Sequence, residues 1–291
     1  MSARDFPTLS LRGVDHTARP TWKLAETVDF YRDKLGLALV HVISARGWGP
    51  ATHPDFLHFF FDSGNGSTIA FFYYLGSDPP ESLDGRASRP PIPDDHVFDA
   101  THTAWLVANE EELKAWKKRL EDQGLKVSVQ TRHEVIESIY VRDPNGYFVE
   151  FTHKLRPLGE VDANDAALTI QAAVEAEAEA AKKCQRVTSI DAIWSQKARL
   201  LDPSNNDDTC VRIFVPRVEE FSTLVQQASS RTDCRVIKGM QHDVIEADAT
   251  VEFNRKELGL KPAVWYGLFT GGVTGRITRF DRDWVTIQPT H

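Results

Sequence analysis

The sequence predicts an α+β protein whose first half contains the same strand, helix and three-strand unit twice. The tripeptide His-Thr-Ala occurs at residues 16–18 and again at residues 102–104, each time in a strand-like context. Each copy is followed by a segment with apolar residues at helical spacing that ends at a glycine, Gly36 or Gly124. Short β-rich runs follow each helix, so both copies are expected to form βαβββ modules.

The β-rich runs are divided by turn residues such as SGNG and DPNG. They read ALVHVIS, FLHFFFDS and STIAFFYYL in the first copy, and KVSVQT, ESIYVR and YFVEF in the second. The modules are therefore expected at about residues 9–76 and 98–156. The proline-rich segment between them predicts a surface connection.

The pattern changes after residue 156. The run DAALTIQAAVEAEAEAAKK is rich in alanine and glutamate, which favours a long helix. Beyond it come a predicted strand CVRIFVP, a predicted helix RVEEFSTLVQQASS and a β-rich run AVWYGLFTGGVTGRITRFDRDWVTIQP. We expect a paired-module domain at 1–157, a helical connector at 158–185 and a smaller α+β domain at 186–291.

Composition narrows the classes of partner. The 291 residues carry 34 Lys and Arg against 42 Asp and Glu, and no basic cluster appears, which argues against nucleic acid. Three cysteines are too few for a disulfide framework and fit a reducing compartment. Neither a signal peptide nor a membrane-length apolar run is present in the sequence. We expect a soluble, cytoplasmic protein that binds neither nucleic acid nor membrane.

Residues 131–151, TRHEVIESIYVRDPNGYFVEF, predict a β-hairpin that carries chemistry. The DPNG turn suits a type I turn with Gly146 as a left-handed bulge, which pairs Asp143 with Tyr147. In that register Tyr140 lies directly opposite Glu150, on the same face of the sheet. A two-residue loop would shift the register by one and separate the two side chains.

Glu150 and the histidines of the two His-Thr-Ala segments form a candidate metal set. A buried carboxylate needs a charge partner, and His16 and His102 stand at equivalent positions of the repeat. Repeated units that pack around a pseudo-twofold axis would place these positions close together. Two histidines and one carboxylate suit non-haem Fe(II) with open coordination positions, and Mn(II) would fit similar ligands.

Residues 9–156 resemble one unit of the vicinal oxygen chelate superfamily, the paired βαβββ fold of glyoxalases, fosfomycin-resistance proteins and extradiol dioxygenases. One run matches, at each spacing, the motif of type I extradiol ring-cleavage dioxygenases. Its residues are Thr131, His133, Ile139, Tyr140, Asp143, Pro144, Gly146 and Glu150.

The resemblance assigns a role to each residue of the predicted site. It implies that His16, His102 and Glu150 are the iron ligands. It also implies that His133 is an active-site acid or base and that Tyr140 hydrogen-bonds a substrate oxygen.

Two features depart from the extradiol pattern. Many extradiol enzymes have a further histidine about fourteen residues before the second ligand, where this chain has Ser88 and Arg89. His96, six residues before His102, is the nearest substitute and is our third candidate catalytic residue. The active unit also comes first here, whereas the commonest bacterial members carry it second.

The resemblance implies an Fe(II)-dependent dioxygenase that uses O2 to cleave a catechol-type ring beside its hydroxyls. The alternatives are a glyoxalase-like lyase, a fosfomycin-type thiol transferase and a small-molecule-binding resistance protein. Glyoxalases usually need a fourth ligand on the last strand of the first copy, and STIAFFYYL has no Glu, His or Gln. Binding relatives lose the metal ligands, which this chain keeps.

The C-terminal domain is expected to supply no metal ligand. Its aromatic residues would instead cover an open edge of the chelate unit or form a dimer contact, so we expect a homo-oligomer. These residues are Trp265, Tyr266, Phe269 and Trp284.

Overall fold

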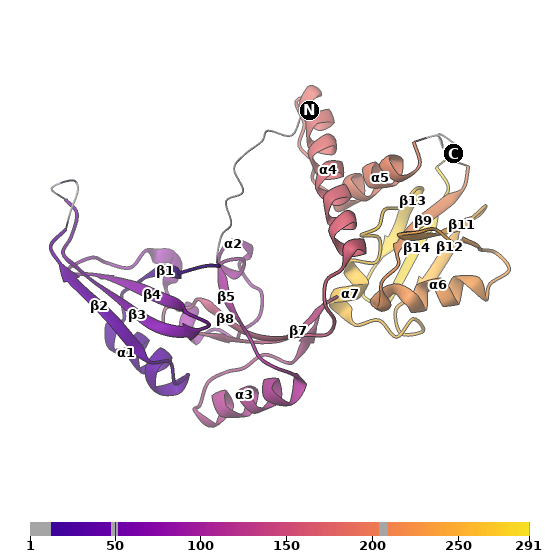
Figure 1. The fold of residues 1–291 in the computed structure, drawn as a ribbon. Coiled ribbons are helices and arrows are strands. Elements are labelled where there is room, and N and C mark those ends of the chain that lie inside the picture. Colours follow the sequence, from indigo (N-terminus) through magenta and orange to yellow (C-terminus); the bar gives the residue numbers. More distant parts are fainter. Residues whose placement is uncertain (1–12, 48–49, 51, 204–208, 291) are drawn as a thin grey trace, which may run out of the picture. The chain divides into compact units, whose positions relative to one another are not determined.

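The computed structural model describes residues 13–47, 50, 52–203 and 209–290, and it separates into two compact units (Figure 1). The first unit comprises Met1–Thr131 and Glu137–Lys154, and the second comprises Arg132–Ile136 and Leu155–His291. Residues 9–12, the predicted start of the first module, lie outside the described residues. Both units combine helices with sheets, which confirms the predicted α+β class.

The first unit contains two βαβββ modules. The elements of the first module are β1 His16–Thr21, α1 Leu24–Val28, the π-helix Asp29–Lys34, β2 Leu39–Ala45, β3 Phe56–Gly64 and β4 Ser67–Tyr74. Those of the second are β5 His102–Leu106, α3 Glu110–Asp122, β6 Thr131–Arg132, β7 Ile136–Arg142 and β8 Phe148–Lys154. The strand orders β1-β4-β3-β2 and β5-β8-β7-β6 are equivalent, and the first pair in each is parallel. The predicted pair of modules is therefore confirmed.

The run KVSVQT does not form the full strand that its β-branched residues predict. Only β6 and an isolated bridge between Val127 and Val141 remain of it. The Val129 side chain is 80% exposed. Since β-branched residues favour a strand mainly through packing, an exposed valine gains little from one.

The hairpin of β7 and β8 has the predicted register. Gly146 has a φ of 92°, and its N–H donates to the Asp143 carbonyl at 2.9 Å. The Asp143 N–H donates to the Tyr147 carbonyl at 2.9 Å, as the bulged turn requires. Further out, the Leu155 N–H donates to the Val135 carbonyl at 2.9 Å in the same register. Tyr140 therefore lies opposite Glu150.

The turn of this hairpin also joins the two modules. The Tyr31 hydroxyl donates to the Asp143 carboxylate at 3.1 Å, and the Thr21 hydroxyl donates to the Asn145 side-chain oxygen at 2.8 Å. All four residues are buried. Burial raises the pKa of the Tyr31 hydroxyl well above its usual value, and the Asp143 charge raises it further, so this phenol remains a donor.

The connection between the modules is anchored by the buried Arg86. It contains two 3-10 turns, Glu81–Leu83 and Arg86–Ser88, and the short helix α2 His96–Asp99. Arg86 is 1% exposed and pairs with Asp95 at 3.2 Å and Asp99 at 3.1 Å. These ion pairs hold a segment of proline-rich composition in one conformation.

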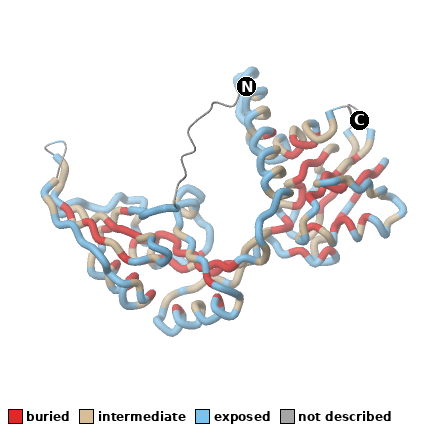
Figure 2. The backbone as a smooth tube through the Cα atoms, in the orientation of Figure 1, coloured by how far each residue is buried: buried red, intermediate tan, exposed pale blue. Residues whose placement is uncertain are grey.

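The second unit begins with two packed helices and continues with two small sheets. Its elements are α4 Glu160–Lys182, α5 Ile190–Leu201, β9 Val211–Pro216, the 3-10 turn Glu219–Phe221, α6 Ser222–Ser229, β10 Arg235–Ile237, β11 His242–Ala247, β12 Val251–Asn254, α7 Pro262–Tyr266, β13 Arg276–Phe280 and β14 Trp284–Gln288. The sheets have strand orders β10-β11-β9 and β12-β14-β13. The predicted long helix is confirmed as α4, and Figure 2 shows that most of it is exposed.

The β-rich interpretation of the run AVWYG is wrong, because these residues lie in and directly after α7. Pro262 occupies the start of the helix, where its missing N–H costs nothing. Trp265 and Phe269 are fully buried in the core of their own unit, so they cannot form the dimer contact expected of them. Tyr266 is 53% exposed.

A buried lysine fastens α5 to α4. The Lys197 ammonium is 0% exposed and donates to Asp165 at 2.6 Å, Thr169 at 2.7 Å and the Thr270 carbonyl at 2.6 Å. These three acceptors satisfy its three N–H groups. His242 shares the same Asp165 oxygen at 2.8 Å. The network explains how a lysine can be buried within the unit.

Arg156 fixes the start of α4 through two carboxylates. Its guanidinium contacts Asp162 at 2.7 Å and Glu220 at 2.7 Å, and Asp162 also accepts the Gly159 N–H at 2.7 Å. Chiefly through the Arg156 hydrogen bond, the pKa of the Asp162 carboxyl falls to about 2.

None of the described helices has both the length and the apolar content needed to cross a membrane.

Gly146→Ala should destabilise the first unit more than Gly76→Ala does. Both glycines have positive φ, so each substitution should cost about 1–2 kcal/mol in backbone strain. A Cβ at Gly146 would also lie 2.4 Å from the Arg86 Cβ, whereas one at Gly76 meets nothing within 4 Å. We expect roughly 1–3 kcal/mol of extra loss for Gly146→Ala, measured by urea unfolding. Equal losses in the two variants would contradict the close contact.

Asp162→Asn should flatten the acid limb of the stability profile. Because folding lowers the pKa of Asp162, its stabilising contribution is present above the ordinary carboxyl value of about 3.9 and is lost as pH falls towards about 2. At neutral pH the variant should lose about 1 kcal/mol in urea unfolding. Glu160→Gln removes the same charge from the same turn without touching Arg156, and it should keep the wild-type slope between pH 5 and pH 2 if Asp162 carries the effect.

Candidate metal and ligand site

His102 and Glu150 meet on the parallel strands β5 and β8. The register pairs Ala104 with Glu150, two residues from His102. His102 Nε2 lies 3.1 Å from Glu150 Oε2, with side-chain exposures of 37% and 4% respectively. A nearly buried carboxylate thus faces an accessible imidazole.

Two side chains of β7 complete the surroundings of Glu150. The Ser138 hydroxyl donates to Glu150 Oε1 at 2.5 Å, and the Tyr140 side chain hydrogen-bonds the same carboxylate. Burial, and then the Glu150 charge, raise the pKa of Tyr140 to about 12, so its phenol stays protonated. Ser138 is not among the predicted site residues, although it precedes Tyr140 by two residues and the alternation of a strand puts both on one face.

Each predicted histidine ligand has an oxygen at its Nδ1. His102 Nδ1 lies 3.0 Å from the Asp99 carbonyl, and His16 Nδ1 lies 2.7 Å from the Asp15 carboxylate. Metal-binding histidines commonly hold one ring nitrogen in this way and ligate with the other. The donors present in these residues therefore suit Fe(II) or Mn(II). Asp15 is not among the predicted site residues, and its position directly before His16 in the sequence is the signal that could have indicated it.

The structure does not bring His16 to the pair of His102 and Glu150. His16 lies on β1 with 45% of its side chain exposed, and its ring is 6.3 Å from His58 and 5.7 Å from Phe60. Among the described residues, no group of three or more His, Cys, Asp and Glu is positioned to hold a metal ion. One chain thus assembles two of the three predicted ligands, and the complete set stays a prediction.

His58, which we interpret as a structural residue, is 5% exposed and packs against Phe60 and Phe72. Burial lowers the pKa of this imidazole, and the nearby His16 and His41 lower it further. A neutral ring suits the aromatic surroundings.

His96 is exposed and begins α2. Asp95 caps this helix by accepting the N–H groups of Val97 and Phe98. The catalytic role of His96 stays a prediction.

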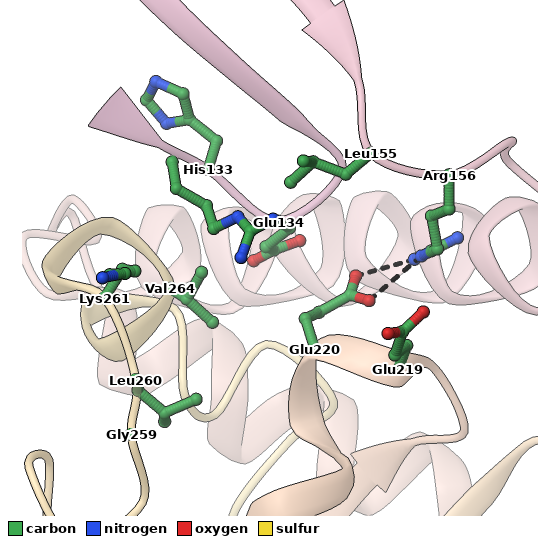
Figure 3. A pocket seen from close by; sticks show the side chains of 11 residues that line it. His133, Glu134, Leu155, Arg156, Glu219, Glu220, Gly259, Leu260, Lys261 and Val264 are labelled. Atoms are coloured by element: carbon green, nitrogen blue, oxygen red, sulfur yellow. Dashed lines mark hydrogen bonds and ion pairs between the residues drawn. The ribbon is translucent and has the colours of Figure 1, made fainter. Parts of the chain in front are cut away.

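His133 belongs to the second unit, where it lines a cavity of about 220 Å³ (Figure 3). Its N–H donates to the Ile136 carbonyl at 2.9 Å, which closes a tight loop between β6 and β7. Leu260, Lys261 and Val264 line the same cavity. The C-terminal domain thus contributes to the pocket that contains the motif histidine, a role the sequence did not indicate.

The cavity has a mixed charge. Glu134 is partly buried within it, and burial raises the pKa of its carboxyl, followed by the charges of Glu220 and Asp165. Figure 3 shows Glu220 turned towards Arg156. Glu134 has no such cation within ion-pair distance among the described residues, so its carboxyl remains available to a ligand.

Comparison with protein families matches residues 13–151 to the model described as the Glyoxalase/Bleomycin resistance protein/Dioxygenase superfamily. The comparison with curated protein sequences found no match.

Several solved structures are similar to about half of this chain. A lactoylglutathione lyase from Agrobacterium tumefaciens is 26% identical, with 50% of this chain and 95% of that one covered and a TM-score of 0.33. A glyoxalase/dioxygenase from Nostoc punctiforme is 18% identical, with 54% and 99% covered and a TM-score of 0.38. TnmS3, an antibiotic binding protein from Streptomyces sp. CB03234, is 16% identical, with 50% and 98% covered and a TM-score of 0.33.

The paired βαβββ modules and the family match concern the same part of the chain. Residues 13–151 thus carry the fold and the sequence pattern of the glyoxalase/bleomycin resistance protein/dioxygenase superfamily.

Proposed function

We propose that the protein is an Fe(II)-dependent extradiol dioxygenase that opens a catechol-type ring with O2 in the cytoplasm. The superfamily name covers lyases, dioxygenases and resistance proteins, so this choice depends on the site. The observation that carries it is the contact between His102 and Glu150, with Tyr140 hydrogen-bonded to the same carboxylate. The extradiol motif requires this spacing of tyrosine and glutamate.

Bound Fe(II), or Mn(II), would supply coordination positions at which a catechol and O2 are held side by side. His16, His102 and Glu150 are the proposed ligands. Ser138 and the Asp99 carbonyl hold Glu150 and His102 in orientation. Tyr140 stays protonated and can donate to a substrate oxygen, while His133 is proposed to transfer protons.

The first module supports a three-ligand set over a four-ligand one. Its register pairs Ala18 with Ala70, the position equivalent to the pairing of Ala104 with Glu150. Ala70 is fully buried and has no donor atom for a metal. A lyase that needs a fourth protein ligand at this position is therefore disfavoured.

We propose that His16 reaches His102 and Glu150 from a second copy of the chain. His16 and His102 are both accessible, as ligands donated across an interface must be. The edge strand β2 also exposes apolar side chains, which a second copy would cover. These residues are Leu39, Val40, Val42 and Ile43.

Replacing any proposed ligand should remove iron. After anaerobic loading with Fe(II), His16→Ala, His102→Ala and Glu150→Ala should each bind at least about tenfold less iron than the wild type, because second-sphere losses alone reach that size. His53→Ala, at a half-buried histidine of the first unit that belongs neither to the proposed ligands nor to β2, is the control and should load fully. Metal analysis after desalting gives the occupancy, and full loading of Glu150→Ala would refute the assignment.

A mixture of two variants tests the second copy. His16→Ala and Glu150→Ala, unfolded together and refolded, should regain about a quarter of the wild-type iron sites, because random pairing makes half the dimers mixed and each mixed dimer keeps one intact site. A mixture that binds no more iron than its separate components, while refolded wild type loads normally, would mean that one chain forms the site alone.

His133→Phe should keep iron but slow ring opening by about 10² to 10⁴ in kcat, the usual contribution of an acid or base. Tyr140→Phe should have a smaller effect, because it removes a single hydrogen bond. Oxygen uptake with catechol and the absorbance of a yellow product measure both rates. The His53→Ala variant is again the control, and an unchanged kcat in His133→Phe at every pH would exclude the histidine from proton transfer.

A further inference from the structure

The second unit has an open cleft of about 680 Å³ that is separate from the pocket of His133. Its walls come from the end of α4, the length of α5 between Asp191 and Arg199, the connection between these helices and the start of β13. This volume is within the range of pockets that bind small organic molecules, about 300–1,000 Å³.

Four cationic side chains and two anionic ones line the cleft. The cations are Lys183, Arg186, Arg199 and Arg276, and the anions are Glu179 and Asp191. Glu179 is already paired with Lys182, 2.5 Å away. The cleft therefore has an excess of positive charge in a protein whose formal net charge is −8.

None of the four cations forms an ion pair with a carboxylate of the described residues. Among the described residues, Arg199 and Arg276 donate to neutral amide oxygens, those of Gln196 at 3.2 Å and Gln288 at 3.3 Å. Arg279, on the same strand as Arg276 but outside the cleft, is paired with Asp281 at 2.6 Å. The cleft thus holds four cations without a carboxylate partner among the described residues, and this arrangement leaves the guanidinium N–H groups for a ligand.

The remaining lining suits the other parts of an organic ligand. Thr188 and Ser189 bring hydroxyl groups to the N-terminal end of the 12-residue helix α5, where the backbone favours negative charge. Val273 and Ile277 add apolar side chains to the lining. A ligand with an acidic group and an apolar body would match both kinds of lining residue.

We propose that this cleft binds a phosphate monoester with an apolar body. Several arginines around one anion favour a doubly charged, multiply accepting group, because a guanidinium binds phosphate oxygens in pairs. Neither the iron site nor the dioxygenase activity enters this argument, so the proposal stands or falls independently of the proposed function.

Phenyl phosphate is the probe, and isothermal titration calorimetry on the full-length protein gives its Kd. Binding should be saturable with one site per chain. Benzoate, which carries a single charge, and inorganic phosphate, which has no apolar body, should each bind more weakly by at least about tenfold, since one good contact is worth about that factor.

Arg186→Gln and Arg276→Gln should each weaken phenyl phosphate binding by about tenfold or more, because each removes a charge-assisted hydrogen bond. Arg279→Gln, on the same strand as Arg276 but outside the cleft, is the matched control and should bind as the wild type does. Both cleft residues are exposed, and unfolding curves should confirm that the variants fold.

Two outcomes would overturn the proposal. One is the lack of saturable binding of phenyl phosphate by folded protein at millimolar concentration. The other is an equal loss of affinity in Arg276→Gln and Arg279→Gln, which would show a general effect of surface charge.

Discussion

The first unit depends on the buried turn between β7 and β8. The Asp143 carboxylate accepts the N–H groups of Asn145 and Tyr147 at 2.9 Å each and the Tyr31 hydroxyl at 3.1 Å. Burial raises the pKa of Asp143 in spite of these hydrogen bonds, so the charged carboxylate has a free-energy cost in the core. The contacts that the turn makes offset this cost. With Gly146 in the left-handed region, the turn sets the strand register and anchors the first module to the second.

The same hairpin serves both units. Its inner part carries Tyr140 and Glu150 within the first unit, while the loop of residues 132–136 and the chain from Leu155 belong to the second. The proposed iron ligands and the proposed proton-transfer residue His133 therefore depend on different packing environments. The second unit thus includes the loop that carries His133, a residue that the predicted motif groups with Tyr140 and Glu150.

The incomplete metal set follows from the same geometry. Glu150 and His102 come together because β5 and β8 are hydrogen-bonded neighbours in one sheet. His16 lies in the other sheet, where β4 rather than β5 is its partner. Strand pairing alone does not unite the three residues, and for this reason the proposal places the third ligand on a second copy, whose contact would also cover the apolar edge strand β2.

The sequence by itself determined the repeat, the hairpin register and the pairing of Tyr140 with Glu150, because turn chemistry and strand alternation are local rules. It also predicted α4 from composition. Only the tertiary structure decided that AVWYG lies in and after a helix, that Trp265 and Phe269 fill a core, and that Ser138 donates to Glu150. It also decided that His133 lines a pocket with the C-terminal domain. These outcomes depend on which distant surfaces pack together, and no local pattern encodes that choice.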